Sequence, residues 1–169
     1  MRFLIDIVVI VTLAVVGLFL YHQYWDAFKE SWSAYRQSEQ TVYLGSVAIS
    51  VTIADDEKKQ RQGLSGVKSL RDLEGKLFIF NIDGPWGIWM KDMLIPLDII
   101  WVDKNLRVVH IEENVAPDTY PAVFSSPRDA RFVLEMNAHF VSSVRIKEGD
   151  RLTLPASLLP SDIRRDLQK

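Results

Sequence analysis

The chain of 169 residues contains no cysteine. It therefore has no disulfide bonds, and any domain that it forms must be held together by its hydrophobic core. Histidine is scarce too: His22, His110 and His139 stand far apart, and none has a second ligand at a spacing that metal sites use. The sequence therefore predicts neither a metal site nor another cofactor.

A surplus of charge of one sign is also absent. The 20 basic and 22 acidic side chains are interspersed and leave a net charge of −2 at pH 7. Without a basic stripe or cluster, nucleic acid is excluded as an expected partner. Catalytic motifs are missing as well, because no nucleophile elbow surrounds a serine and the glycines form no phosphate-binding pattern. These absences favour a protein that is not an enzyme.

One long apolar run differs from the mixed polarity of the rest. It extends from Phe3 to Tyr21, and Asp6 is its only side chain that is charged at neutral pH. As a helix rising about 1.5 Å per residue, it is long enough for the ~30 Å hydrocarbon core of a bilayer. The bulky residues that follow it offer no cleavage site, so residues 1–21 are predicted as an uncleaved transmembrane signal anchor. A cleaved signal is the alternative.

The anchor predicts a single-pass protein of the cytoplasmic (inner) membrane that contacts lipid through residues 3–21. Arg2 and the amino terminus make the N-terminal flank positive, and positive flanks favour the cytoplasmic side. The soluble domain is therefore expected outside, which is the periplasm if the source is bacterial.

Residues 22–40 are predicted to continue the helix beyond the membrane and to end in a short polar linker. Their aromatic side chains recur at spacings of three and four, so they share one helix face. Packing at the membrane interface is the simpler interpretation of this face, and a homodimer or a structural subunit of a membrane complex is the alternative. The aromatic residues are Tyr21, Tyr24, Trp25, Phe28, Trp32 and Tyr35.

Short strands dominate the prediction for residues 41–154. Hydrophobic residues alternate from Val47 to Ile53, and further apolar runs of strand length follow. Asp55 can cap a short surface helix that Gly63 closes. No succession of strands and helices of the βαβ kind is visible. The predicted fold is mainly β, a compact sandwich or small barrel of about seven or eight short strands with one or two short helices.

Three local expectations complete the prediction of structure. Asn105 is expected in a left-handed conformation in a tight turn. Residues 114–130, which include three prolines, are expected to form a long loop without regular structure. Residues 155–169 are expected to form a polar tail with a short helix.

Five short motifs occur in order between residues 47 and 154. They are RQGL (61–64), GKLFIF (75–80), WMKDMLIPLDIIWVD (89–103), VLEMNA (133–138) and EGD (148–150). In this order they resemble the DUF192 family, also called UPF0127, which usually has Asn at the position of Asp92 and Gly at that of His139. The resemblance implies a compact β-rich domain, often exported or membrane-anchored, without a settled activity.

Two carboxylates on predicted strands are the main candidates for chemistry. By alternation, Asp98 shares a strand face with Ile100, and Glu135 shares one with Val133. A carboxylate on a buried face must be hydrogen-bonded or paired, because desolvating it alone is costly. In one interpretation Asp98, Glu135 and Lys91 converge in a polar pocket. In the other, each carboxylate ties down backbone N–H groups of a turn.

The leading hypothesis is a non-enzymatic module that binds a small molecule, a glycan or an envelope protein. Its binding surface is predicted at the turn Trp86–Asp92 and the loop Asn114–Arg131. The alternative is a hydrolytic enzyme that uses two paired carboxylates, Asp98 and Glu135. The predicted ligand-binding residues are Trp89, Met90, Lys91, Asp92, Asp98, Arg131 and Glu135.

Overall fold

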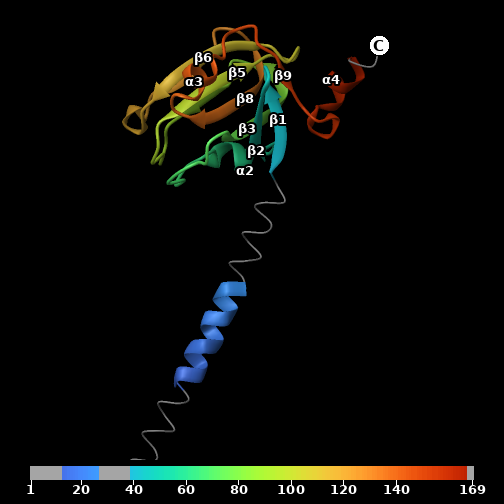
Figure 1. The fold of residues 1–169 in the computed structure, drawn as a ribbon. Helices are drawn as coiled ribbons and strands as arrows, with labels where there is room; N and C mark the ends of the chain where they lie inside the picture. Colours follow the sequence, from blue (N-terminus) through green and yellow to red (C-terminus); the bar gives the residue numbers. More distant parts are fainter. Residues whose placement is uncertain (1–12, 27–38, 167–169) are drawn as a thin grey trace, which may run out of the picture. The chain divides into compact units, whose positions relative to one another are not determined.

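The computed structural model describes residues 13–26 and 39–166 of the chain (Figure 1). Its contacts divide the chain into two compact units, Met1–Ser38 and Glu39–Lys169. Each unit is described by itself below.

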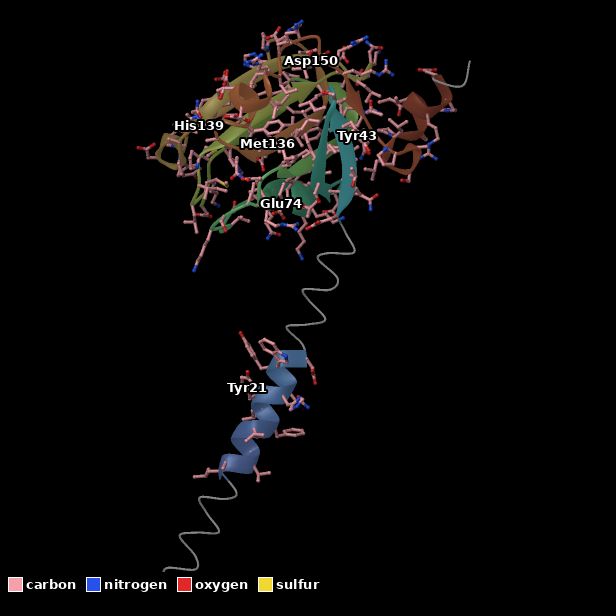
Figure 2. The ribbon with its side chains drawn as sticks, in the orientation of Figure 1. Tyr21, Tyr43, Glu74, Met136, His139 and Asp150 are labelled. Atoms are coloured by element: carbon pink, nitrogen blue, oxygen red, sulfur yellow. The ribbon has the colours of Figure 1, made fainter. Side chains whose placement is uncertain are left out.

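In the first unit, residues 13–26 form a helix. All its side chains are exposed, and Tyr21 is among those that project from it (Figure 2). Residues 3–12 of the predicted anchor lie outside the described residues, as do three of the six aromatic residues, Phe28, Trp32 and Tyr35. Across the two described stretches, no helix combines the length and apolar character needed to span a membrane.

The second unit is built around one curved sheet of seven strands, accompanied by a two-stranded ribbon (Figure 1). The strands are β1 (Gln40–Leu44), β2 (Val47–Ala54), β3 (Glu74–Gly84), β4 (Gly87–Trp89), β5 (Leu97–Val102), β6 (Val108–Val115), β7 (Val123–Ser125), β8 (Ala130–Asn137) and β9 (Leu152–Thr153). The sheet has the order β6–β5–β8–β3–β2–β1–β9, and the ribbon pairs β4 with β7. The mainly β class predicted from the sequence is confirmed.

The short helix α2 (Glu57–Gln62) connects β2 and β3, which are neighbouring parallel strands. This connection is a single βαβ unit, which the sequence analysis did not predict. No residue of α2 is buried, and a helix so short and polar carries little periodic signal. Its N-cap is Asp56 rather than Asp55, because Asp56 Oδ1 accepts a hydrogen bond from Lys59 N at 2.8 Å. Gly63 ends the helix at a φ of 48°, which favours glycine.

The sheet curls until its two edge strands, β6 and β9, meet at one end. Just before these strands, Arg107 and Arg151 form an antiparallel β-bridge. Beside the bridge, Val108 N donates a hydrogen bond to Asp150 O at 2.9 Å. These bonds use backbone groups that an open edge would leave unpaired. The sheet therefore encloses a core on its inner face, in the manner of a barrel closed over part of its length.

Hydrophobic side chains cover both faces of the curled sheet. The enclosed face is covered by α3 (Phe140–Val144) and by the C-terminal segment with α4 (Ser161–Asp166), whose Ile163 is buried. The outer face is covered by the β4–β7 ribbon and by the turn that follows α2. The enclosed core includes Val42, Leu44, Ile49, Val51, Leu77, Ile100, Phe132, Leu134 and Met136, and the outer core includes Leu64, Phe78, Phe80, Ile88, Met90, Ile99, Trp101 and Val133.

Two local expectations were wrong. Residues 114–130 are not a loop without regular structure, because they contain the 3-10 turn η1 (Pro117–Thr119) and β7, which pairs with β4. A strand of three residues is too short for alternation to reveal it. In the turn between β5 and β6 the left-handed residue is Leu106, with a φ of 61°, rather than Asn105. The short helix expected in the tail is present as α4.

Candidate functional site

Strand register separates the two candidate carboxylates. Between β5 and β8, Asp98 pairs with Met136, and Ile99 pairs with Glu135. Paired residues on neighbouring strands point to the same face of a sheet, whereas successive residues point to opposite faces. Asp98 therefore lies on the enclosed face, and Glu135 lies on the outer face. The structure does not bring them together, because the sheet itself stands between them.

Asp98 holds the backbone at one end of the sheet. Its side chain is fully buried. Oδ1 accepts hydrogen bonds from Asn114 N at 2.9 Å and from His139 N at 3.3 Å, and Oδ2 accepts one from Val141 N at 2.8 Å. Asn114 and His139 both have positive φ, at 57° and 69°. The three N–H donors offset the desolvation of the carboxylate. The carboxylate in turn fixes two positions of left-handed backbone, one in the irregular part of β6 and one just before α3.

Glu135 is buried to a similar extent, with 4% of its surface exposed, but its carboxyl group is not satisfied in this way. Within the described residues, Oε2 has no hydrogen-bond partner. Lys76 lies directly across the β3–β8 pairing from Glu135 and is the nearest basic residue in the register. Buried polar atoms are nearly always paired with protein or water, so this exception requires an explanation.

The Glu135 side chain lines a cavity of about 40 Å³ on the outer face of the sheet. The end of α2 with the following turn forms one wall, β4 forms another, and Phe78 and Met93 complete the lining. A Cβ atom built on Gly63 would lie 3.5 Å from both carboxyl oxygens of Glu135, so glycine keeps this wall close to the carboxyl group. The space admits water or a small chemical group, whereas drug-sized ligands occupy roughly 300–1,000 Å³.

Four of the five DUF192-like motifs meet at this cavity. The sheet brings them together although they are spread along the sequence between residues 61 and 135. The cavity takes Arg61–Leu64 from RQGL, Phe78 from GKLFIF, Trp89 and Met93 from the WMKD motif, and Glu135 from VLEMNA.

Burial raises the pKa of the Glu135 carboxyl group from 4.5 to about 8, because desolvation penalises its charged form. The Lys76 ammonium opposes this rise to a smaller extent. Burial in turn lowers the pKa of Lys76, against the attraction of Glu135. At pH 7 the Glu135 side chain is therefore mostly a neutral carboxylic acid. A group with such a shift at the wall of a cavity is typical of functional sites.

Of the predicted ligand-binding residues in this turn, Trp89 is at the cavity. Trp89 is 46% exposed, lines the cavity, and meets the ring of Tyr120 edge-on at 6.5 Å between centroids. Met90 is buried in the outer core, and the side chains of Lys91 and Asp92 are exposed. None of these last three lines the cavity.

The backbone of the same turn has a structural role. Ser65 Oγ donates a hydrogen bond to Lys91 O at 2.7 Å, and Gly66 N donates one to Asp92 O at 2.9 Å. Asp92 has a φ of 55°, a conformation in which Asn and Asp are tolerated better than most residues. These bonds fasten the turn after α2 to the segment after β4, and so hold two walls of the cavity together.

Arg131 lies away from the cavity. Its guanidinium group is buried and forms ion pairs with Asp83 at 3.1 Å and with Asp162 at 2.6 Å. Asp162 belongs to α4, so this pair of contacts fastens the C-terminal helix to β8. Of the predicted ligand-binding residues, the structure therefore places two, Trp89 and Glu135, at the cavity.

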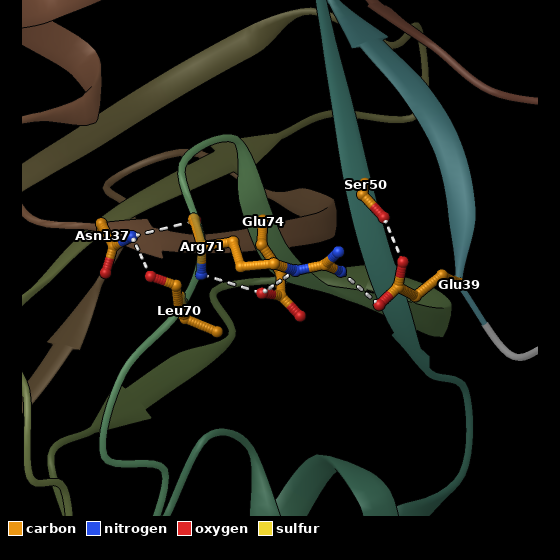
Figure 3. A network of polar contacts seen from close by, with 6 residues as sticks. All are labelled: Glu39, Ser50, Leu70, Arg71, Glu74 and Asn137. Atoms are coloured by element: carbon orange, nitrogen blue, oxygen red, sulfur yellow. Dashed lines mark hydrogen bonds and ion pairs between the residues drawn. The ribbon is translucent and has the colours of Figure 1, made fainter. Parts of the chain in front are cut away.

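A polar network holds the segment that leads from the cavity wall to β3 (Figure 3). Arg71 donates to Glu74 Oε2 through its backbone N at 2.9 Å and its Nε at 3.1 Å, and to Glu39 Oε1 at 2.6 Å. Asn137 Nδ2 donates to the carbonyl groups of Leu70 and Arg71, each at 3.3 Å. The segment is thereby tied to the start of β1 and the end of β8.

Sequence reasoning did not assign Gly63, Leu64 or Phe78 to a site. Their only signal was membership of the motifs that resemble DUF192. Gly63 was predicted to end a helix, which it does. The position of Gly63 beside the Glu135 carboxyl group depends on the βαβ connection and on the strand register. Local sequence patterns predict neither.

Three other hollows in the second unit are larger, at about 460, 320 and 290 Å³. In the part of the chain that the structure describes, the buried side-chain atoms without a hydrogen-bond partner are Glu135 Oε2 and Arg131 Nε. Neither residue lines these three hollows. The Glu135 cavity is therefore the candidate functional site.

Comparisons with known proteins agree with the resemblance. Residues 40–154 match the model of the family DUF192, described as "Uncharacterized ACR, COG1430". The match spans most of the second unit, and the chain belongs to the DUF192 family. No curated protein matches the chain.

Two solved structures share this fold. One is described as "a putative transcription regulator" from Sinorhizobium meliloti 1021. It is 29% identical to this chain, with a TM-score of 0.66. The match covers 69% of this chain and 93% of that one. The other is a protein of unknown function from Novosphingobium aromaticivorans DSM 12444, 28% identical with a TM-score of 0.64, covering 68% of this chain and 84% of that one.

Replacing Glu135 by Gln is expected to stabilise the fold at pH 8 and to change stability little at pH 4. Because folding raises the pKa of this carboxyl group from 4.5 to about 8, the unfolded chain releases its proton before the folded chain does. The stability of the wild-type chain therefore falls as pH rises through this window and levels off above it. We expect the variant to gain on the order of 2–4 kcal/mol at pH 8, measured by urea unfolding.

Asp98→Asn is the matched comparison for Glu135→Gln. It weakens an acceptor of three N–H groups, so it should destabilise the fold at pH 8 by about 1–3 kcal/mol. A Glu135→Gln variant that is less stable than the wild type at pH 8, or that gains equally at both pH values, would contradict the burial of an unsatisfied carboxyl group.

Proposed function

We propose that this DUF192 protein is a ligand-binding module and that its site is the Glu135 cavity. The observation that carries the proposal is the Oε2 atom of Glu135, which is buried and has no hydrogen-bond partner among the described residues. Leaving such an atom unpaired costs about 1–3 kcal/mol. A bound group that supplies the missing hydrogen bond accounts for a fold that keeps this atom beside a cavity.

The side chains around Trp89 suit the rest of such a ligand. Trp89 and Tyr120 are each 46% exposed, and Val123, which pairs with Trp89 across the ribbon, is 61% exposed. Aromatic side chains with one free face are common in sites for small molecules and glycans. A ligand can therefore place a small polar head at Glu135 and rest an apolar or ring-shaped part on Trp89. A small molecule, a glycan and a side chain of an envelope protein all meet this description.

The geometry favours binding over hydrolysis. A hydrolase with two carboxylates needs both within reach of one bond or one water. Asp98 lies on the opposite face of the sheet and is engaged by three backbone N–H groups. A role in transcription, which the description of the Sinorhizobium structure names, has no support in the charge of this chain, which is −2 with both signs interspersed.

We also propose that the first unit tethers the module to the cytoplasmic membrane, with the module on the outer side. The proposal rests on the apolar run Phe3–Tyr21. It is supported by residues 13–26, whose large apolar side chains, such as Leu18 and Phe19 at 68% and 63%, are exposed. A contiguous apolar surface of this kind is usually covered by another apolar phase.

A fragment screen tests the ligand-binding proposal. The full-length chain in detergent micelles would be titrated with small amines, alcohols, amides and carboxylic acids, and the indole N–H resonance of Trp89 would be followed by NMR. At least one class should shift this resonance in the wild type and not in Glu135→Leu, which removes the polar atoms.

The matched control for that screen is Glu113→Leu, which makes the same change at an exposed glutamate on β6. This control should bind like the wild type. If no class shifts the Trp89 resonance, or if the shift persists in Glu135→Leu, the Glu135 cavity is not the site.

Deleting residues 1–26 is expected to move the protein from the membrane fraction to the soluble fraction, because the apolar run is removed. The measurement is alkaline extraction of membranes followed by detection of the second unit. A full-length chain that already extracts into the soluble fraction would contradict the tether. Protease digestion of spheroplasts should degrade the second unit if it lies outside.

A further inference from the structure

We infer that the Glu135 cavity binds a primary ammonium group carried on a short apolar stem. The inference rests on the proposed function, since it names the chemical class of the ligand for the same site. It stands on three features of the described residues: the balance of donors and acceptors at the cavity, its size and lining, and the absence of a paired cation at Glu135.

The cavity offers acceptors, while several of its nearest donors are already used. Gln60 Nε2 donates to the carbonyl groups of Ala54 and Ile79, and Gly63 N donates to Lys59 O. Ser65 donates through both its backbone N and its hydroxyl group, to Gln62 O and Lys91 O. These donors do not engage the Glu135 carboxyl group, and the cavity lies at the C-terminal end of α2, where helix carbonyl groups carry partial negative charge. Such a site attracts a donor with positive charge.

The size and the lining of the cavity favour a ligand with a small polar group on a short apolar chain. A cavity of about 40 Å³ has room for an ammonium group with its first methylenes. Phe78, Ile88 and Met93 supply apolar walls, with exposures of 2%, 6% and 8%. At the rim, the indole face of Trp89 can contact the stem and attract the cation. A quaternary ammonium group is larger and has no N–H donor, so the site should discriminate against it.

Among the described residues, the basic side chains near the cavity form no ion pair with Glu135. Lys76 approaches Glu135 from β3, and within the described residues it forms no ion pair with the carboxyl group. On α2, Lys59 is paired with Asp55 at 2.6 Å and with Asp56 at 3.1 Å. Arg61, also on α2, is paired with Glu57, and Lys91 after β4 is exposed.

Binding of a cation at Glu135 should release a proton. With a pKa of about 8, the carboxyl group holds a proton at pH 6 to 7 in the free protein. An ammonium ion pairs with the carboxylate, so the carboxyl proton leaves to the solvent as the ligand enters. Affinity for the amine should therefore increase with pH until Glu135 is ionised, as long as the amine stays protonated. A ligand that accepts a hydrogen bond from the neutral acid would show the opposite trend.

The test is a calorimetric titration of the full-length chain in micelles with n-butylamine and with Nα-acetyl-lysine methylamide. The first probe represents a free amine, and the second represents a lysine side chain of a protein. From a pKa of about 8, the ionised fraction of Glu135 and hence the affinity should rise about fifty-fold between pH 6 and pH 8. At pH 6, buffers of different ionisation enthalpy should show release of about one proton for each amine bound.

Three controls make the result decisive. n-Butanol, which has the same stem without charge, and tetramethylammonium should bind at least tenfold more weakly than n-butylamine at pH 8. Glu135→Gln should lose amine binding, and Glu113→Gln, the same change at an exposed site, should keep it. Binding of both amines supports a free-amine site, and binding of the lysine derivative alone supports a peptide partner.

Two results would overturn the inference, and they differ in what they say of the proposed function. If n-butanol binds as well as n-butylamine, or if affinity falls with rising pH while Glu135→Gln still abolishes binding, the cavity is a ligand site for a neutral acceptor. In that case the ammonium class is wrong and the proposed function stands. If Glu135→Gln binds n-butylamine as the wild type does, and no fragment shifts the Trp89 resonance, both fail.

Discussion

A carboxylate cannot remain charged in an apolar interior without partners, and this one sheet meets that constraint in two different ways. Asp98 accepts hydrogen bonds from three backbone N–H groups and fixes two positions with positive φ, Asn114 in β6 and His139 before α3. Glu135, one strand away and on the opposite face, has no such donor at Oε2 and keeps its proton through neutral pH. The protein itself supplies the hydrogen-bond partners of Asp98. Glu135 lacks a partner at Oε2, and the proposed function depends on this missing partner.

The surrounding fold explains how an incomplete carboxyl group is maintained. The βαβ connection from β2 to β3 places the end of α2 against the outer face, where Gly63 approaches both oxygens of Glu135 without a side chain. The β4–β7 ribbon adds the exposed ring of Trp89. Hydrogen bonds from Ser65 and Gly66 to the segment after β4 hold these walls together. The result is a small, rigidly framed cavity on a sheet whose edges are closed elsewhere, and such preorganised framing is what a binding site requires.

Much of this fold was predictable from local sequence, and the site was not. The alternation of apolar residues placed Asp98 and Glu135 each on the correct face of its own strand. Whether the two faces lie on the same side of the sheet depends on register and strand order. Those depend on long-range pairing, such as β5 beside β8 and β8 beside β3, which no local pattern encodes. The short helix α2 was predicted from its capping residues, whereas β7, with three residues, leaves no periodic signal. Two of the departures from the family motifs have a physical context: Asp92 and His139 both have positive φ, where the Asn and Gly of the family are favoured.

The central claim is that Glu135 is a buried carboxylic acid open to a ligand, and not a carboxylate paired within the protein. The most direct measurement is the carboxyl carbon resonance of Glu135, followed by NMR in a chain labelled at glutamate and assigned with Glu135→Gln. The account predicts a transition with its midpoint near pH 8, well separated from those of the exposed glutamates. A midpoint below about pH 5, the range of ordinary glutamates, would contradict it.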